Sequence, residues 1–264
     1  MIATDKSTLI IGHRGSSALA PENTLVAFAR ALRDGADGIE LDVRLSRDGV
    51  PVVIHDATLR SRLRKRFVSR MTAEQLQQAD VGSWFNRRHR RLARLEYIRQ
   101  TIPTLDEVFV LTNKDPDKSS IVYVELKCGR SRKKNRDLAR ETLNVINRRQ
   151  MEKRVVVISF NLRTVAHVKE IDPSIRTGAL FGPRPAVLKR TDKIIAAAIR
   201  SGANEVLLHH QIATKKLTAA AHSHHLPVVI WTVDNRKWLL RARQLGLYAL
   251  MTNNPPMMLR GSVG

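Results

Sequence analysis

Short apolar runs alternate with amphipathic stretches along most of the chain. Runs rich in Val, Ile and Leu predict nine β-strands, at Thr8–Gly12, Gly38–Val43, Pro51–His55, Ile121–Lys127, Val155–Phe160, Arg176–Leu180, Glu205–His209, Pro227–Val233 and Tyr248–Thr252. Apolar residues at helical spacing predict helices at Thr24–Asp34, Lys134–Gln150, Leu162–Ile171, Thr191–Ser201, Lys215–His224 and Arg236–Gln244. This alternation is typical of βα units around a parallel sheet. A closed eight-stranded barrel needs one strand fewer, so one of the nine is an edge or terminal piece, and periodicity does not decide which.

The segment Ala57–Pro103 interrupts the alternation before another helix opens at Thr104. Its middle carries one helix start, at Thr72. It holds twelve Lys or Arg against three acidic residues, with basic runs at Arg60–Arg66 and Arg87–Arg91. No repeat or flexible linker marks a second domain. We therefore expect residues 1–264 to form one α/β domain, a (β/α)8-like barrel with an insertion at about 57–103 after the third strand.

Composition narrows the classes of protein that need consideration. The chain has 264 residues and 43% hydrophobic residues, and no stretch is apolar enough over about 18 residues to predict a spanning helix. The first eight residues lack the pattern of a secretory signal, which favours a cytoplasmic location. The single cysteine, Cys128, excludes an intrachain disulfide and a cysteine-rich metal site. A formal charge of +22 favours anionic partners such as phosphate esters, nucleic acid or anionic lipid, without choosing among them.

Ionisable side chains gather where three consecutive predicted strands end. They are His13 and Arg14, Glu40 and Asp42, and His55 and Asp56. The carboxyl ends of barrel strands form one mouth, where active sites of this architecture lie. We therefore expect these groups to converge.

Glu40 and Asp42 lie two residues apart in an apolar strand, so both side chains point to one face of it. Two carboxylates within about 4 Å in a low-dielectric site cost several kcal/mol unless a cation joins them. Glu125 and Lys127 repeat the spacing on a later strand. Three carboxylates and water would supply the oxygen ligands that Mg²⁺ or Ca²⁺ prefers. Taken alone, a pair such as Glu40 and Asp42 more often caps a helix or pairs with an arginine than binds a metal ion.

The combination of groups is more specific than any one of them. A histidine alone is commonly structural, but here two histidines accompany carboxylates on two other strands and a lysine. Cleavage of a phosphodiester requires proton transfer at the attacking and leaving oxygens while negative charge develops around phosphorus. The sequence therefore predicts a phosphodiester-cleaving site.

A series of motifs in a fixed order resembles the glycerophosphodiester phosphodiesterase family. The resemblance covers nearly the whole chain and rests on Ile11–Gly15, Pro21–Thr24, Gly38–Val43, Asp48–Asp56, Gly82–Phe85, Ile102–Leu105, Glu125–Lys127 and Trp231–Val233. It implies a (β/α)8 barrel related to that of phosphatidylinositol-specific phospholipase C, with a small insertion. It also implies hydrolysis of a glycerophosphodiester to sn-glycerol 3-phosphate and an alcohol.

The resemblance also implies roles for single residues. Glu40, Asp42 and Glu125 would hold a divalent cation, Mg²⁺ or Ca²⁺, and His13 and His55 would act as general acid and base in an order that stays open. Arg14 and Lys127 would hold phosphate oxygens, and Trp231 would form an apolar wall for the glycerol. Two departures from the family pattern lie outside this set: Asp234-Asn235 stands where Asn-Asp is usual, and Thr252-Asn253-Asn254-Pro255 replaces a Thr-Asp-Tyr-Pro-like turn.

Other interpretations stay open. His209 and His210 end a strand and could contact substrate, whereas His222, His224 and His225 follow a helix and favour a structural role. The basic insertion could bind an anionic membrane, which would allow lysophospholipase D-like activity, or could make the chain mainly a lipid- or nucleic-acid-binding protein. Sparse aromatic residues argue against specific nucleic-acid recognition. A lyase that stops at a cyclic phosphate is disfavoured by the carboxylate cluster.

Overall fold

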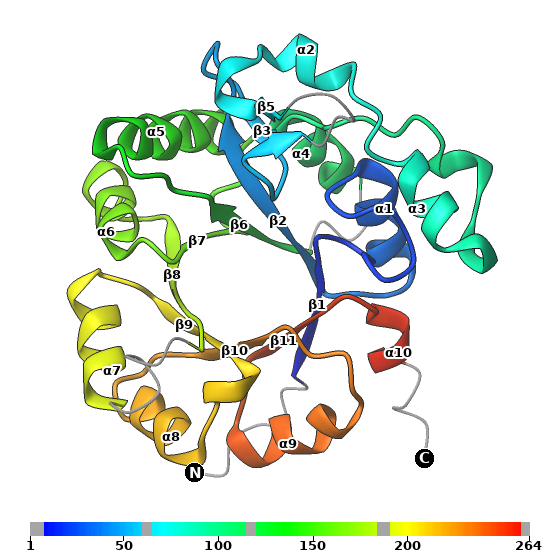
Figure 1. Ribbon diagram of the computed structural model, residues 1–264. Helices are drawn as coiled ribbons and strands as arrows, with labels where there is room; N and C mark the ends of the chain where they lie inside the picture. The colour runs from blue at the N-terminus through cyan, green and yellow to red at the C-terminus, as the bar shows by residue number, and fades with distance from the viewer. Residues whose placement is uncertain (1–7, 60–64, 115–119, 184–190, 260–264) are drawn as a thin grey trace.

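Eight parallel strands close into a barrel surrounded by helices in the computed structural model, which describes residues 8–59, 65–114, 120–183 and 191–259 (Figure 1). The barrel strands are β1 (Leu9–His13), β2 (Gly38–Leu45), β6 (Ile121–Leu126), β7 (Val155–Ser159), β8 (Arg176–Phe181), β9 (Glu205–His209), β10 (Val228–Trp231) and β11 (Ala249–Thr252). The ring closes because β1 pairs with β11 on one side and with β2 on the other. The predicted (β/α)8 fold is confirmed.

Helices cover the outside of the barrel (Figure 1). They are α1 (Leu25–Arg33), α4 (Leu105–Asn113), α5 (Arg132–Arg148), α6 (Leu162–Ile171), α7 (Thr191–Arg200), α8 (Lys215–Ser223), α9 (Lys237–Leu245) and the short α10 (Pro255–Leu259), which was not predicted. For six of these helices the sequence predicted both the first and the last residue, and each predicted end lies within about two residues of the observed one. Thr24 and Thr104 begin α1 and α4, each accepting a hydrogen bond from a backbone N–H in the first turn.

One of the nine predicted strands, Pro51–His55, lies outside the barrel. β3 (Pro51–Val53) pairs antiparallel with the end of β2, with Val53 opposite Val43 and Pro51 opposite Leu45. The expectation that His55 follows the carboxyl end of a barrel strand is therefore wrong. Instead β2 runs past the rim, and the chain turns back along it, so that Ile54 N donates to Asp42 O at 2.8 Å. His55 reaches the mouth through this return.

The region between β3 and α4 contains small elements. The described part forms a hairpin of β4 (Thr58–Leu59) and β5 (Arg66–Phe67), the helices α2 (Ala73–Gln77) and α3 (Ser83–Arg88), and 3-10 turns at Val68–Arg70, Arg90–Leu92 and Leu95–Tyr97. α3 lies beyond α1 at the edge of the molecule (Figure 1). Phe85 and Tyr97 pack there with Ala20 and Ala27. Of the basic run Arg60–Arg66, residues 60–64 lie outside the described residues, as do residues 1–7 of the N-terminus.

The apolar core has an outer and an inner part. Between strands and helices, large clusters bury residues such as Phe28, Phe109 and Ile146. Inside the barrel, a smaller cluster includes Ile11, Tyr123 and other strand residues. This filled interior leaves polar side chains to gather at the mouth. Among the helices described, none is long and apolar enough to cross a membrane.

Candidate active site

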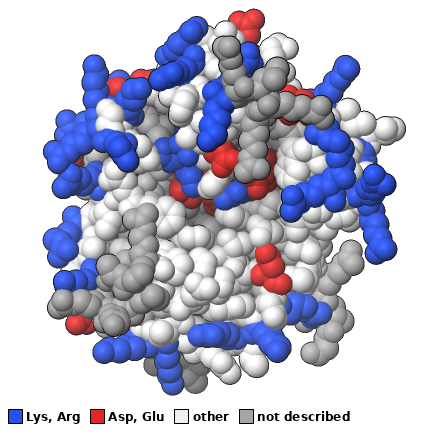
Figure 2. Space-filling model, in the orientation of Figure 1, with Lys and Arg blue, Asp and Glu red and all other residues white. Residues whose placement is uncertain are grey.

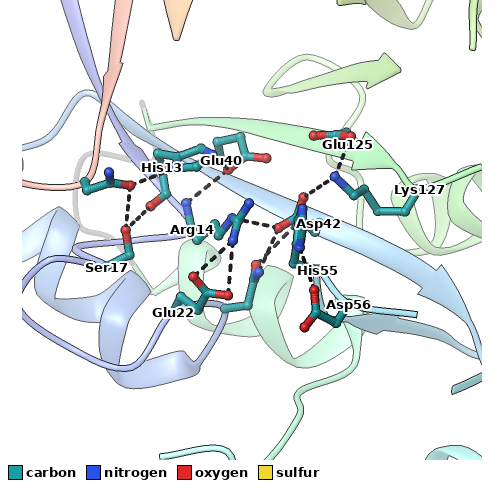
Figure 3. A network of polar contacts seen from close by, with 12 residues as sticks. His13, Arg14, Ser17, Glu22, Glu40, Asp42, His55, Asp56, Glu125 and Lys127 are labelled. Atoms are coloured by element: carbon teal, nitrogen blue, oxygen red, sulfur yellow. Dashed lines mark hydrogen bonds and ion pairs between the residues drawn. The ribbon is translucent and has the colours of Figure 1, made fainter. Parts of the chain in front are cut away.

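The register of three neighbouring strands assembles the centre of the site. His13 at the end of β1 lies opposite Glu40 on β2, and Asp42 on β2 lies opposite Glu125 on β6. Because Glu40 and Asp42 alternate with Leu41, both face the barrel interior while Leu41 packs against the helices. Figure 3 shows the resulting group of side chains. The predicted convergence of these residues is present in the structure.

Three carboxylates form a compact buried cluster. Glu40, Asp42 and Glu125 each offer an oxygen within 4.8 Å of the other two. All three side chains are almost completely buried. Among the described residues, no other group of three or more His, Cys, Asp or Glu side chains lies close enough together to hold one metal ion.

Two cationic side chains partly neutralise the cluster. Lys127 Nζ lies 2.8 Å from Glu125 Oε1 and 3.2 Å from Asp42 Oδ1. Arg14 Nε lies 3.1 Å from Asp42 Oδ2, and its backbone N–H donates to Glu40 Oε2 at 3.0 Å. Both residues thus lie in direct contact with the carboxylates of the cluster.

Arg14 and Lys127 are too few to stabilise the ionised form of all three carboxylates. Burial, followed by repulsion from Asp42, raises the pKa of Glu40 to about 8 and that of Glu125 to about 7. Burial also acts to raise the pKa of Asp42, but Lys127 and Arg14 outweigh it and lower that pKa to about 2. Asp42 therefore stays ionised, whereas burial and mutual repulsion oppose ionisation of the two glutamates, an effect that a bound divalent cation would reverse.

The cluster fits a hard divalent cation. All its ligand atoms are carboxylate oxygens, which suit Mg²⁺ and Ca²⁺. Asp42 Oδ1 is buried and accepts no hydrogen bond from any described residue, although Lys127 lies close to it. A carboxylate oxygen without a hydrogen bond, beside two glutamates whose ionisation is opposed by burial, is a donor set that an added positive charge would stabilise. The cluster could bind a metal ion.

His13 is held in place by a hydrogen bond to a residue near the other end of the sequence. Its Nδ1 lies 2.8 Å from Asn253 Oδ1, which also accepts a hydrogen bond from Ser17 Oγ. Since that amide oxygen can only accept, Nδ1 carries the proton and Nε2 presents a lone pair to the site. Nε2 lies 3.8 Å from Glu40 Oε2. Burial, and then the charge of Arg14, lowers the pKa of His13 and favours this neutral form.

His55 is more exposed and lies beside Asp42 (Figure 3). Its Nδ1 lies 3.0 Å from Asp56 Oδ1, and its backbone carbonyl accepts two hydrogen bonds from Arg44. Burial lowers the pKa of His55, and the charge of Asp42 opposes that effect. The two histidines therefore approach the cluster from different elements, with Asp42 and Glu40 between them.

Trp231 lies on another part of the mouth. It ends β10, and its indole makes edge-on ring contacts with Phe160 after β7 and His209 at the end of β9, at centroid distances of 5.4 and 5.0 Å. His210 stacks against His209 at 4.2 Å. The rings form an aromatic group at the ends of β7, β9 and β10 that is separate from the acidic cluster on β2 and β6. His222 and His224 lie at the end of α8, consistent with the structural interpretation.

Several residues that hold the site were not predicted to do so. Glu22 accepts two hydrogen bonds from Arg14 Nη1, at 3.1 and 3.0 Å, and Asn23 donates to Asp42 Oδ2 at 2.8 Å. Both belong to the motif Pro21–Thr24, whose polar middle pair was the available signal. Asp234 accepts from Asn253 Nδ2 at 2.6 Å and from its backbone N–H. The two departures from the family pattern therefore contact each other and, through Asn253, His13.

The barrel brings carboxylates, imidazoles and cationic groups together at one mouth. These groups are the ones that hydrolysis of a phosphoric diester requires. The family model described as "Glycerophosphoryl diester phosphodiesterase family" matches residues 13–257. A glycerophosphodiester phosphodiesterase of Caldanaerobacter subterraneus is 31% identical over 253 residues, 96% of this chain and 96% of that protein. The chain belongs to the glycerophosphodiester phosphodiesterase family, whose enzymes are phosphoric diester hydrolases.

Solved structures agree with this assignment. A crystal structure of a provisionally named glycerophosphoryl diester phosphodiesterase from Silicibacter pomeroyi has a TM-score of 0.88 and 27% identity, covering 98% of this chain and 94% of that one. A phosphodiesterase from Oleispira antarctica, solved in complex with the product sn-glycerol-3-phosphate, has a TM-score of 0.80 and 25% identity, covering 96% and 95%. The likeness to both extends over the barrel and its insertion.

Proposed function

We propose that the protein hydrolyses glycerophosphodiesters to sn-glycerol 3-phosphate and an alcohol, in a reaction that requires a divalent cation. The observation that carries the proposal is the buried triad of Glu40, Asp42 and Glu125, whose oxygens lie within 4.8 Å of one another beside two histidines. The product named for the Oleispira antarctica structure supports the same substrate class. The chain would act as one domain with an insertion at about 57–103.

A bound Mg²⁺ or Ca²⁺ would polarise a phosphoryl oxygen and stabilise the negative charge that develops on it. Arg14 and Lys127 would hold the remaining phosphoryl oxygens. One histidine takes a proton from the attacking oxygen, which belongs to water or to the neighbouring glycerol hydroxyl. The other donates a proton to the leaving alcohol as its bond to phosphorus breaks. Trp231 would pack against the glycerol carbons.

Release of glycerol 3-phosphate from glycerophosphocholine and glycerophosphoethanolamine tests the proposal. The assay compares Mg²⁺, Ca²⁺ and EDTA for the wild type, for Glu40→Gln and for the exposed control Glu74→Gln. We expect metal-dependent activity in the wild type and control and none in Glu40→Gln. Wild-type protein inactive with every metal would overturn the assignment of these substrates and direct the assay to lysophospholipids.

We propose as a second function that the insertion contacts anionic membranes, which would permit lysophospholipase D-like activity on membrane lysophospholipids. Leu95 is 87% exposed and Ile98 47%. Trp84, 40% exposed, lies nearby, because Arg99 N donates to Ser83 Oγ at 3.2 Å. The same segment carries exposed arginines at positions 87, 88, 90, 91, 94 and 99. Exposed apolar side chains in an arginine-rich segment suit contact with an anionic lipid interface.

Co-sedimentation with phosphatidylglycerol and phosphatidylcholine vesicles tests the membrane contact. We expect binding to the anionic vesicles at low salt, and its loss when Leu95 and Ile98 are both changed to Ser. The matched control changes Ile171 and Ile199, which are 43% and 47% exposed elsewhere on the molecule, to Ser. Wild-type protein that stays in the supernatant at low salt, or that binds a DNA duplex equally well, contradicts the proposal.

A further inference from the structure

A large groove leads away from the acidic cluster between two helices. It has a volume of about 1310 Å³, above the usual range for small-ligand pockets. Its inner end is formed by Glu125 and Lys127, and its walls by residues of the start of α5 and of α6. The assigned roles use the inner end alone. The rest of the groove can therefore receive the part of a substrate that lies beyond the reacting phosphate.

The walls of the groove are strongly basic. Six cationic side chains line it, against the two acidic residues Glu125 and Glu170. The cationic residues are Arg44, Lys127, Arg130, Arg132, Arg136 and Arg163. Figure 2 shows Lys and Arg side chains along the edge of the molecule at the left, over α5 and α6, and acidic residues nearer the middle of the face. The charge of the groove is thus opposite to that of the cluster at its inner end.

Both acidic residues already have partners. Glu125 pairs with Lys127, and Glu170 Oε2 lies 3.0 Å from His167 Nδ1. Arg130, Arg132, Arg136 and Arg163 are exposed, and in the described part of the chain none of them has an ion-pair partner. Arg132 and Arg136 are four residues apart, so they share one face of α5. The groove therefore carries unneutralised positive charge.

Arg44 adds a cation at the inner part of the groove. Its guanidinium donates to the backbone carbonyl of His55 at 2.9 and 2.7 Å and approaches that of Lys127 at 3.5 Å. These carbonyls fix the guanidinium but do not neutralise it, and no described carboxylate lies within ion-pair distance of it. α5 and α6 also begin beside the groove, and helix N-termini favour negative charge.

We propose that this groove binds the leaving alcohol of the substrate and selects an alcohol that carries a second phosphate group. The inference rests on the proposed phosphodiesterase function and names its substrate class. The scissile phosphate would lie at the cluster and the second phosphate among the arginines of α5 and α6. Arginine suits this task because its planar group of N–H donors matches the oxygens of phosphate. The reaction itself stays the same, with water added across the phosphorus–alcohol bond.

Two substrates that differ by one phosphate test the proposal. They are glycerophosphoglycerol and the same compound phosphorylated on the terminal hydroxyl of its leaving glycerol. We expect kcat/KM of the wild type to be at least about tenfold higher for the phosphorylated compound. Changing Arg132, Arg136 and Arg163 together to Gln should bring the ratio of the two values close to one. All three side chains are exposed, so the variant should keep its fold, which the Tm checks.

A matched control separates local binding from long-range attraction. Changing Lys193, Arg200 and Lys216 to Gln removes the same charge from exposed positions on α7 and α8. We expect this control to keep the wild-type ratio. Equal kcat/KM for the two compounds in the wild type, or an equal fall of the ratio in the control, overturns the groove proposal alone. Failure to cleave either compound overturns the proposed function as well.

Discussion

The barrel buries carboxylates at both of its ends, but the carboxylates at the two ends differ in how many donors and cations they contact. At the mouth, Glu40, Asp42 and Glu125 share Arg14 and Lys127, and Asp42 Oδ1 accepts no hydrogen bond within the described residues. At the floor, Glu205 on β9 accepts from Tyr123 Oη at 2.9 Å and from Arg176 Nη2 at 3.0 Å. One carboxylate is satisfied by two donors there. Three carboxylates at the mouth are left in excess over their cations.

A single strand contributes to both ends. Tyr123 and Glu125 lie two residues apart on β6 and face the barrel interior in successive layers. Burial raises the pKa of Glu205 as it does those of Glu40 and Glu125, but Arg176 and Tyr123 act against it. The difference therefore lies in the partners and not in the burial. The carboxylate at the floor has its partners as folded, whereas the cluster at the mouth could bind an added cation.

The largest expected effect comes from removing one carboxylate charge at the mouth. Glu125→Gln keeps the shape of the side chain and an oxygen that can accept from Lys127. Metal affinity depends on the lost charge, so we expect kcat/KM to fall by about 10³-fold or more. Stability in EDTA should stay the same or rise, because repulsion with Asp42 is removed. Steady-state kinetics and urea unfolding measure the two effects, and a stability loss without an activity loss would contradict the assignment.

Removing the carboxylate at the floor should lower stability strongly and leave catalysis almost unchanged. Glu205→Ala removes the buried partner of an ion pair and leaves the Tyr123 hydroxyl without its acceptor. Because the Arg176 side chain is 35% exposed, we expect a cost of about 2–3 kcal/mol of unfolding free energy, below the about 3–5 kcal/mol of a fully buried pair. The folded variant should keep kcat within about twofold, since the mouth is untouched. Glu205→Gln serves as the milder control, because its amide oxygen can still accept from Arg176 and its amide nitrogen can donate to the Tyr123 hydroxyl. The contrast between the two ends fails if Glu205→Ala unfolds at the wild-type urea concentration.

The mouth was partly visible in the sequence and the floor was not, for a physical reason. Strand periodicity alone put Glu40 and Asp42 on one face of their strand, and Glu125 and Lys127 on one face of theirs, because alternation is a local property of the backbone. The register that puts His13 opposite Glu40 depends on how whole strands pack, and periodicity carries no information about it. The reversal that brings His55 back to Asp42 was also missed, since an antiparallel return has the same apolar pattern as a barrel strand.

The link between His13 and Asn253 shows the same limit. The two residues are 240 positions apart and meet because β1 and β11 are neighbours in the closed barrel. The sequence marked Asp234 and Asn253 only as departures from the family pattern, without a reason for them. Their mutual hydrogen bonds supply the reason, because they hold the amide oxygen toward His13.

Removing this link should have a moderate effect on catalysis. Asn253→Ala takes away the acceptor for His13 Nδ1, so the ring would lose its fixed tautomer and orientation. We expect kcat to fall about tenfold, equivalent to about 1.4 kcal/mol, with a smaller change in KM. Asn254→Ala is the matched control, because Asn254 accepts from Met257 N, whereas His13 Nδ1 pairs with Asn253. A loss confined to KM, or an equal loss in the control, would argue against orientation of His13.

The smallest effect should come from a carboxylate with good partners but little burial. Asp106 at the start of α4 accepts from Arg148 and Arg149, and these hydrogen bonds lower its pKa to about 2. Because the folded-state pKa lies below the usual 3.8, the stabilisation is complete above that value and disappears as pH falls toward about 2.

Solvent screens this exposed pair, so Asp106→Asn should cost less than about 1 kcal/mol at neutral pH. Urea unfolding at several pH values, with the exposed Asp192→Asn as control, measures the cost and its decline in acid. A cost near that of Glu205→Ala would mean that pairing alone, without burial, determines how much a carboxylate stabilises this barrel. A small cost would leave burial as the property that makes Glu205 matter to the fold and makes the excess carboxylates at the mouth available to a cation.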